Sequence, residues 1–191
     1  MVDYFDSVAK NYGTLRFLPL KRLEMRKILE FGDFSKNDSV LDIGCGNGIY
    51  LRKIENKVGL SVGLDNSKEM IRQARKTCKR SRFIRADAEN FSLKQKFDKI
   101  LCLGILEFCK IPENVLENCS KHLKKKGKLI VLYPRANLTG NFYKLYHAIV
   151  SKKKIRLFRN MWIDNKIKKF KLRKIKQAEF LFSAISIYEK M

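Results

Sequence analysis

The sequence predicts an α/β protein with a mostly parallel, doubly wound sheet and helices on both faces. Short apolar runs alternate five times with segments of helical periodicity, which is the pattern of repeated strand–helix–strand units. These runs are continuously apolar or nearly so, as in parallel strands that are buried on both faces. The five expected strands are residues 39–43, 58–65, 82–85, 97–103 and 128–133.

Helices are expected between and around these strands, over residues 19–31, 49–56, 66–78, 112–123 and 159–169. Asn66 is expected to cap one of them, with Glu69 three residues later as its capping-box partner. Lysines 124–126 followed by Gly127 are typical of a helix C-terminus. Two further strands are expected around residues 176–178.

Length and composition predict a single globular domain. The 191 residues suffice for a sizeable core, and 45% of them are apolar. No stretch approaches the roughly 18 apolar residues that span a bilayer, and the N-terminus lacks the basic start of a signal peptide. The five cysteines form no Cys-x-x-Cys pair, so we expect reduced thiols and no zinc site. These features predict a cytoplasmic protein.

The positive charge is large and uneven. The net charge is +23, and residues 120–191 hold 20 Lys and Arg against 3 Asp and Glu, whereas residues 1–119 hold 22 against 16. A basic half is typical of proteins with an anionic partner such as nucleic acid or a membrane surface. A lysine-rich solvated surface without a partner is the alternative. Lys outnumbers Arg, and Lys is the weaker choice for bidentate recognition of phosphate.

A glycine-rich turn follows the first expected strand. Asp42 ends the apolar run, and Gly44, Gly46 and Gly48 follow at alternate positions before a helix-compatible segment. Such glycines permit unusual backbone angles and the close approach of a ligand. The spacing is not the dinucleotide fingerprint, because no glycine lies three residues after Gly46. A turn without a ligand is the alternative at this point.

The form Asp-x-Gly-x-Gly-x-Gly resembles motif I of the class I S-adenosylmethionine (SAM) methyltransferases. Three later positions match that family in order: Asp65 at the end of the second strand, Asp87 after the third and Gly104 after the fourth. The resemblance implies that Asp65 accepts the ribose hydroxyls, as acids do in dinucleotide folds. It also implies that Asp87 and the next backbone N–H contact the adenine, and that the end of the fourth strand holds the methionine part.

The resemblance therefore implies SAM as cofactor, without a metal, and a seven-stranded sheet whose last strands include one antiparallel. The implied cofactor-binding residues are Asp42, Gly44, Cys45, Gly46, Asp65, Asn66, Asp87, Ala88, Leu103 and Gly104. The implied organisation is a single domain over residues 1–191, with a helical lead-in or cap in 1–34, the SAM-binding core in 35–135, an acceptor-side helical segment in 136–169 and the final strands in 170–191.

The predicted function is methyl transfer from SAM to a small-molecule acceptor, of anionic or lipid-like character. The Asp/Asn-Pro-Pro-aromatic motif of amino-directed base methylases is absent after the fourth strand, and so is a Pro-Cys nucleophile. Two alternatives remain open: an RNA methyltransferase that uses the basic half, and a SAM-binding protein without catalysis. We expect only weak, non-specific nucleic-acid binding. The sequence leaves the oligomeric state open.

No catalytic residue is fixed by the sequence. His147, Glu107 and Tyr143 are candidates, and for each a structural role is the alternative. His122 stands among lysines and is expected to be solvated. The aromatic segment 141–150 suits either a packed helix or a lid over an apolar acceptor, and Arg135 is a candidate counter-charge for an acidic one.

Overall fold

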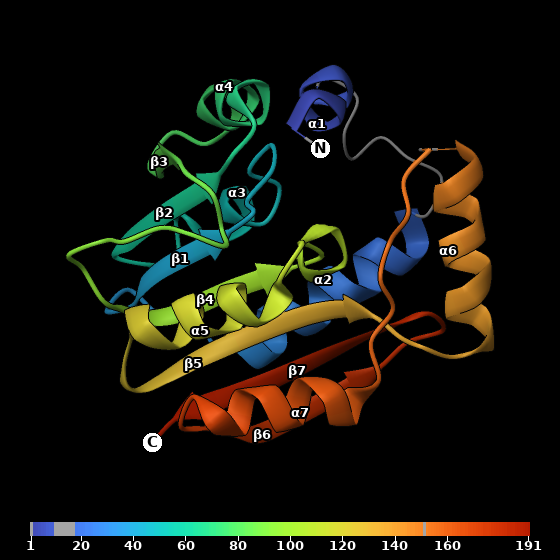
Figure 1. Cartoon of the computed structure of the whole chain (residues 1–191). Coiled ribbons are helices and arrows are strands. Elements are labelled where there is room, and N and C mark those ends of the chain that lie inside the picture. The colour runs from blue at the N-terminus through green and yellow to red at the C-terminus, as the bar shows by residue number, and fades with distance from the viewer. Residues whose placement is uncertain (1, 10–17, 151) are drawn as a thin grey trace.

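The computed structural model describes residues 2–9, 18–150 and 152–191 and contains one seven-stranded sheet (Figure 1). The strands are β1 (Ser39–Ile43), β2 (Leu60–Asp65), β3 (Arg82–Arg85), β4 (Phe97–Leu103), β5 (Leu123–Pro134), β6 (Leu172–Glu179) and β7 (Ser183–Lys190). The helices are α1 (Val2–Val8), α2 (Leu18–Gly32), α3 (Leu51–Ile54), α4 (Lys68–Thr77), α5 (Pro112–His122), α6 (Leu138–Val150) and α7 (Asn160–Lys169), with a short 3-10 turn η1 (Leu106–Phe108). Residues 10–17 of the expected N-terminal lead-in lie outside the described residues.

The strand order is β3-β2-β1-β4-β5-β7-β6. The first five strands in this order pair in parallel, whereas β7 is antiparallel to both β5 and β6. The predicted fold class is therefore confirmed, including the single antiparallel strand. The order reverses between β1 and β4, and in open parallel sheets ligands bind at such a point, beyond the carboxyl ends of the strands.

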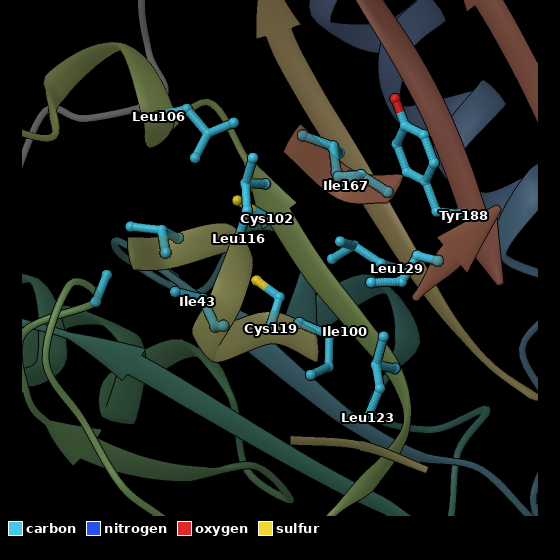
Figure 2. Packing of buried hydrophobic residues seen from close by; sticks show 14 of the residues in the cluster. Ile43, Ile100, Cys102, Leu106, Leu116, Cys119, Leu123, Leu129, Ile167 and Tyr188 are labelled. Atoms are coloured by element: carbon cyan, nitrogen blue, oxygen red, sulfur yellow. The ribbon is translucent and has the colours of Figure 1, made fainter. Parts of the chain in front are cut away.

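Two apolar layers cover the sheet, one on each face. Side chains alternate along a strand, so Leu41 of β1 belongs to the layer with α5 and α7, and Val40 to the layer with α2, α3 and α4. Figure 2 shows the first layer, where Ile100 of β4, Cys119 of α5 and Ile167 of α7 lie in one cluster. This burial on both faces explains why the strands are continuously apolar in sequence.

Several boundaries differ from those expected. The helix after the glycine turn is only Leu51–Ile54, shorter than residues 49–56, because Gly44, Gly46 and Gly48 all have positive φ and the turn extends to Tyr50. The second strand begins at Leu60 rather than at residue 58.

The cap of α4 is Ser67 and not Asn66. The Ser67 hydroxyl oxygen accepts the N–H of Met70 at 3.0 Å, while its backbone is extended as an N-cap requires. With Ser67 as the cap, Glu69 is the second residue of the helix and not the third, and its carboxylate accepts from Arg72 and Gln73 on the same helix. The expected helix end at lysines 124–126 is also wrong: α5 ends at His122, and β5 begins at once.

His122 is buried rather than solvated. Its ring stacks on Phe91 with centroids 4.6 Å apart, and its Nε2 accepts the N–H of Leu93 at 3.0 Å. Residues 176–178 lie within β6, so the turn between the last two strands falls at residues 180–182.

Candidate functional site

The glycine turn lies at the C-terminal edge of the sheet, between the ends of β2 and β4. The N–H groups of Gly44 and Cys45 both donate to the carbonyl of Leu64, at 2.7 and 3.0 Å. Gly44 has φ +70°, and a Cβ there would lie 2.3 Å from the side chain of Ile105. Only glycine fits at this position, because any side chain meets both the backbone strain and this contact.

Asp65 ends β2 and fixes the turn from the other side. Its carboxylate accepts the N–H of Gly46 at 2.8 Å and the N–H of Ser67 at 2.9 Å. Burial raises the pKa of Asp65, and these two backbone donors act in the opposite direction. Because a carboxylate has about four acceptor positions, two remain for hydroxyl groups of a ligand.

Two buried carboxyl groups near this edge each have an oxygen without a partner. Among the described residues, the Oδ2 of Asp42 and the Oε2 of Glu107 accept no hydrogen bond. Asp42 is 1% exposed, and burial together with Asp65 raises its pKa well above the usual range. An unsatisfied buried oxygen is costly in a folded protein, so its presence at a ligand edge indicates a missing donor.

Glu107 follows Gly104 in the loop after β4. An ideal Cβ on Gly104 would be 3.6 Å from the Oε1 of Glu107, so this carboxyl lies against the end of the strand. Burial raises the pKa of Glu107 to about 8, with a further contribution from the negative charge of Glu24 on α2. Glu24 itself is buried and accepts the hydroxyl of Ser183 at 2.5 Å.

The other sequence-predicted residues also lie along this edge. Asp87 is exposed, and its Oδ1 accepts the N–H of Glu89 at 2.9 Å, while Ala88 beside it is buried. Leu103 is buried, and Gly104 has φ +66° and donates its N–H to Leu132.

Cys45 and Asn66 lie at the same edge of the sheet, and neither provides a nucleophile there. The Cys45 thiol is buried, and burial raises its pKa well above the ordinary value, so it stays protonated and is no nucleophile. The carbonyl of Asn66 accepts from the guanidinium of Arg85 at 3.0 Å.

Helix α1 closes over this edge through Asp6, a residue that the sequence analysis missed. The Asp6 carboxylate accepts the hydroxyl of Ser67 at 2.5 Å and the N–H of Glu69 at 3.0 Å, at the positive end of α4. The hydrogen bond from Ser67 lowers the pKa of Asp6, so the contact is charged at neutral pH. In Figure 1, α1 lies beside α4 and beyond the strand ends. Asp6 is 61 residues from Ser67, and only the fold brings them together.

We expect that replacing Asp6 by alanine detaches α1 from α4 without unfolding the core. Amide hydrogen exchange should rise in residues 2–9 while the strands keep their protection, because Asp6 supplies the hydrogen bonds that join α1 to the start of α4. The control is Glu117→Ala, which removes an exposed carboxylate on α5. Unchanged exchange in α1 would show that apolar packing alone holds this helix.

Aromatic rings from four separate segments meet beyond the end of β4. Phe5 of α1 contacts Phe108 of η1 with centroids 5.2 Å apart, and Phe108 lies 6.1 Å from His147 of α6. Tyr143 is 4.6 Å from His147 and stacks on Phe182 at 4.7 Å, in the turn between β6 and β7. The structure thus brings α1, the loop after β4, α6 and the turn between the last two strands together.

His147 is half-buried on the inner side of α6. Among the described residues its Nδ1 has no hydrogen-bond partner, and burial lowers the pKa of the imidazole, with a smaller effect of Lys21. A neutral imidazole at physiological pH can accept a proton. Arg135 is not available as a counter-charge: its guanidinium pairs with Glu179 at 2.5 Å and donates to the carbonyl of Phe180.

A solvent-open groove of about 1000 Å³ lies elsewhere, between α1 and the outer side of α4. Its lining includes Asp6, Lys68, Arg72, Arg75 and Arg85 and none of the glycine turn. The turn and the two buried carboxyl groups of Asp42 and Glu107 lie outside this groove. In the part of the chain that the structure describes, no cluster of His, Cys, Asp or Glu suits a metal ion, and no helix is long and apolar enough to cross a membrane.

The fold and this glycine-turn site define the class I SAM-dependent methyltransferases. A family model described as a methyltransferase domain matches residues 34–179. The chain therefore belongs to the methyltransferase-domain family of that class.

Comparisons with individual proteins agree with this assignment. An uncharacterised protein of Methanocaldococcus jannaschii is 31% identical over 79% of this chain and 62% of its own length. A ubiquinone biosynthesis O-methyltransferase of Proteus mirabilis is 34% identical over 66% of this chain and 56% of its own. The chain thus spans less than two thirds of these relatives. The crystal structure of magnesium protoporphyrin IX methyltransferase from Synechocystis, with bound S-adenosylhomocysteine, has a TM-score of 0.78 at 15% identity, covering 99% of this chain and 97% of that one.

Proposed function

We propose that this chain binds SAM at the glycine turn and transfers its methyl group to a small-molecule acceptor held between η1 and α6. The observation that carries the proposal is the pair of partnerless carboxyl oxygens on Asp42 and Glu107 at the ligand edge. A ligand that brings N–H donors and positive charge would satisfy both. SAM has an ammonium group and a sulfonium, so the residues present fit it.

The other proposed contacts with SAM follow from where each residue lies along the carboxyl ends of the strands. Asp65 has acceptor positions left for the two ribose hydroxyls. Asp87 would accept from the adenine amine, and the N–H of Ala88 would meet the ring. The backbone at Gly46 and Gly104 lets the ligand approach closely. Cys45, Asn66 and Leu103 would line the same edge.

SAM supplies an electrophilic methyl group on its sulfonium. The work of this chain is to hold the acceptor in line with that methyl and to exclude water, and positioning of this kind lowers a barrier by about 7–11 kcal/mol. The ring cluster of Phe5, Phe108 and Tyr143 provides the apolar wall. With a hydroxyl acceptor, neutral His147 would take the O–H proton, and the methyl group would pass to the acceptor oxygen as its bond to sulfur breaks, leaving the uncharged thioether of S-adenosylhomocysteine.

The wall favours an acceptor with an apolar ring and a hydroxyl group over an acidic one. Arg135, the cation considered for an acidic acceptor, is paired, and the buried groups nearby are the carboxyls of Glu24 and Glu107. The name of the Proteus relative, an O-methyltransferase of ubiquinone biosynthesis, supports a hydroxyl acceptor of lipid-like character.

The test is calorimetry of SAM and S-adenosylhomocysteine with the full chain, followed by transfer of tritiated methyl to three acceptor sets: phenols and catechols, aliphatic amines, and ribosomal RNA. We expect binding of both ligands and labelling of the phenolic set. Labelling of RNA alone would replace the proposal with the RNA methyltransferase alternative. Binding without labelling of any set would support the non-catalytic alternative, and no binding would contradict the proposal.

Glu107 gives the proposal a pH signature. Its pKa of about 8 in the ligand-free protein means that it is protonated at pH 7, and a nearby cation stabilises the charged form. Affinity for SAM should therefore rise as the pH increases toward 8 and level off above it, with release of a proton on binding. Calorimetry in buffers of different ionisation enthalpy measures this proton, and Glu107→Gln should abolish it.

The Glu107→Gln variant also tests the effect of this carboxyl on the stability of the fold, separately from its effect on SAM binding. Because folding raises the pKa of Glu107 from 4.5 to about 8, the fold loses stability as the pH rises from about 4.5 to about 8, by on the order of a few kcal/mol. Glu107→Gln should therefore be at least as stable as the wild type at pH 8. Glu117→Gln, an exposed carboxylate on α5, is the matched control. A Glu107→Gln variant that keeps the wild-type proton release would place the cation elsewhere.

A further inference from the structure

The outer face of α6 carries an exposed apolar stripe. Leu138, Phe142, Leu145 and Ile149 are 74%, 66%, 56% and 68% exposed. Their spacing of four, three and four residues places them on one side of the helix. Such a stripe is the part of an amphipathic helix that normally faces a protein core. Here it faces away from the sheet, and Figure 1 shows α6 at the margin of the molecule.

The opposite face of the same helix already packs against the protein. Tyr143 and His147 contact Phe182 and Phe108. At about 100° per residue, His147 lies on the far side of the helix axis from Phe142 and Leu145. The helix is therefore apolar on both sides, and folding of this chain buries only one of them.

The surroundings of the stripe are strongly basic. From Leu138 through Arg159 the sequence holds six Lys or Arg and no Asp or Glu. Lys152 and Lys154 directly follow the end of the helix, and both are exposed. Elsewhere in the described residues, carboxylates pair with basic side chains, for example Glu189 with Arg173 and Asp164 with Lys174.

Charge distinguishes among the possible occupants of this surface. A second copy of the chain would place two such basic surfaces against each other, and like charges in contact oppose association. A single strand of RNA would require aromatic platforms for its bases, and Phe142 is the one aromatic side chain in the exposed stripe. An anionic lipid surface matches both properties, because it accepts apolar side chains below a negative layer of head groups.

We propose that the outer face of α6, with Lys152 and Lys154, docks on an anionic lipid bilayer. Phe142 and Leu145, at the centre of the stripe, would enter the boundary between head groups and acyl chains, while the lysines lie at the phosphates. The inner face of the helix stays on the aromatic wall, so docking would place the acceptor side of the site next to the bilayer. The docking itself does not depend on methyl transfer.

The experiment is flotation of the full chain with vesicles of phosphatidylcholine alone or mixed with phosphatidylglycerol, without SAM or acceptor. We expect binding to the anionic vesicles and at least about tenfold weaker binding to the neutral ones. Binding should weaken with added salt but not vanish, because part of it comes from apolar insertion. Failure to bind anionic vesicles would overturn the proposal, whatever the outcome of the SAM and methyl-transfer assays.

Two pairs of variants test the surface. Phe142→Gln/Leu145→Gln should weaken vesicle binding about tenfold or more, and its control is Met161→Gln, which changes an apolar side chain 73% exposed on α7. Lys152→Gln/Lys154→Gln should also weaken binding, compared with Lys168→Gln/Lys169→Gln elsewhere on the exposed surface. Equal loss in test and control pairs would show general charge attraction only and contradict the assignment to α6. So would sedimentation showing that the stripe mediates self-association without lipid.

Discussion

Replacing His147 by alanine should lower the rate of methyl transfer by about 10²- to 10⁴-fold, the range for loss of a general base. The reason is its position and state: the imidazole is held neutral by burial and has a ring nitrogen without a partner, next to the aromatic wall. Affinity for SAM should persist, because the glycine turn and Asp65 are on other elements. Calorimetry measures the affinity for SAM, and single-turnover transfer of the tritiated methyl group to a phenolic acceptor measures the rate.

The pH dependence of the transfer rate distinguishes a catalytic role of His147 from a structural one, because loss of a purely structural residue would leave this dependence unchanged. Since burial lowers the pKa of His147, the wild-type rate should fall only below pH 6.5, and this acid limb should be lost with the imidazole. Lys144→Ala, which changes an exposed residue of the same helix, is the control, and Tyr143→Ala should reduce acceptor turnover through lost packing. If His147→Ala keeps full turnover, or loses SAM binding as well, the histidine is part of the scaffold.

Asp65→Ala should weaken SAM binding by about 5- to 150-fold, corresponding to about 1–3 kcal/mol for the loss of a charged acceptor of two hydrogen bonds. The carboxylate also holds the N–H groups of Gly46 and Ser67, so its removal loosens the turn at the same time. Calorimetry of SAM and S-adenosylhomocysteine measures the effect.

Asp65→Asn separates these two contributions, because an amide oxygen can still accept one backbone N–H. We expect a thermal unfolding temperature near that of the wild type for Asp65→Asn, with SAM affinity still reduced. Glu117→Ala, which removes an exposed carboxylate far from the turn, should change neither quantity. Unchanged SAM affinity in both folded Asp65 variants would show that the ribose lies elsewhere.

Much of the fold could be predicted because its signals are local. Residues 39–43, 82–85 and 97–103 form strands as expected, since apolar runs bounded by turn residues leave few alternatives. The glycine turn and Asp65 are also local features, and because each follows a strand of an expected parallel sheet, they are predicted to share one sheet edge.

The missed features depend on tertiary contacts or on ambiguous local signals. Asp65, Asn66 and Ser67 are all residue types that cap helices, and only the hydrogen bonds of the folded turn select Ser67. His122 stands among lysines in sequence, but the helix turns it toward Phe91. The contact between Asp6 and Ser67 has no local signal at all. The two-sided apolar pattern of α6 left its packing undecided between a helix in the core and a lid.

The position of β7 constrains how the chain folds during synthesis. β6 is made before β7, yet β7 lies between it and β5, and β7 is the strand to which β6 pairs. Strands β1 to β5 can therefore assemble as they leave the ribosome. Until β7 is made, β6 has no strand to pair with and the outer edge of β5 stays unpaired. Completion of the sheet is a late insertion of one strand between two others, and that step should be most sensitive to crowding by other nascent chains.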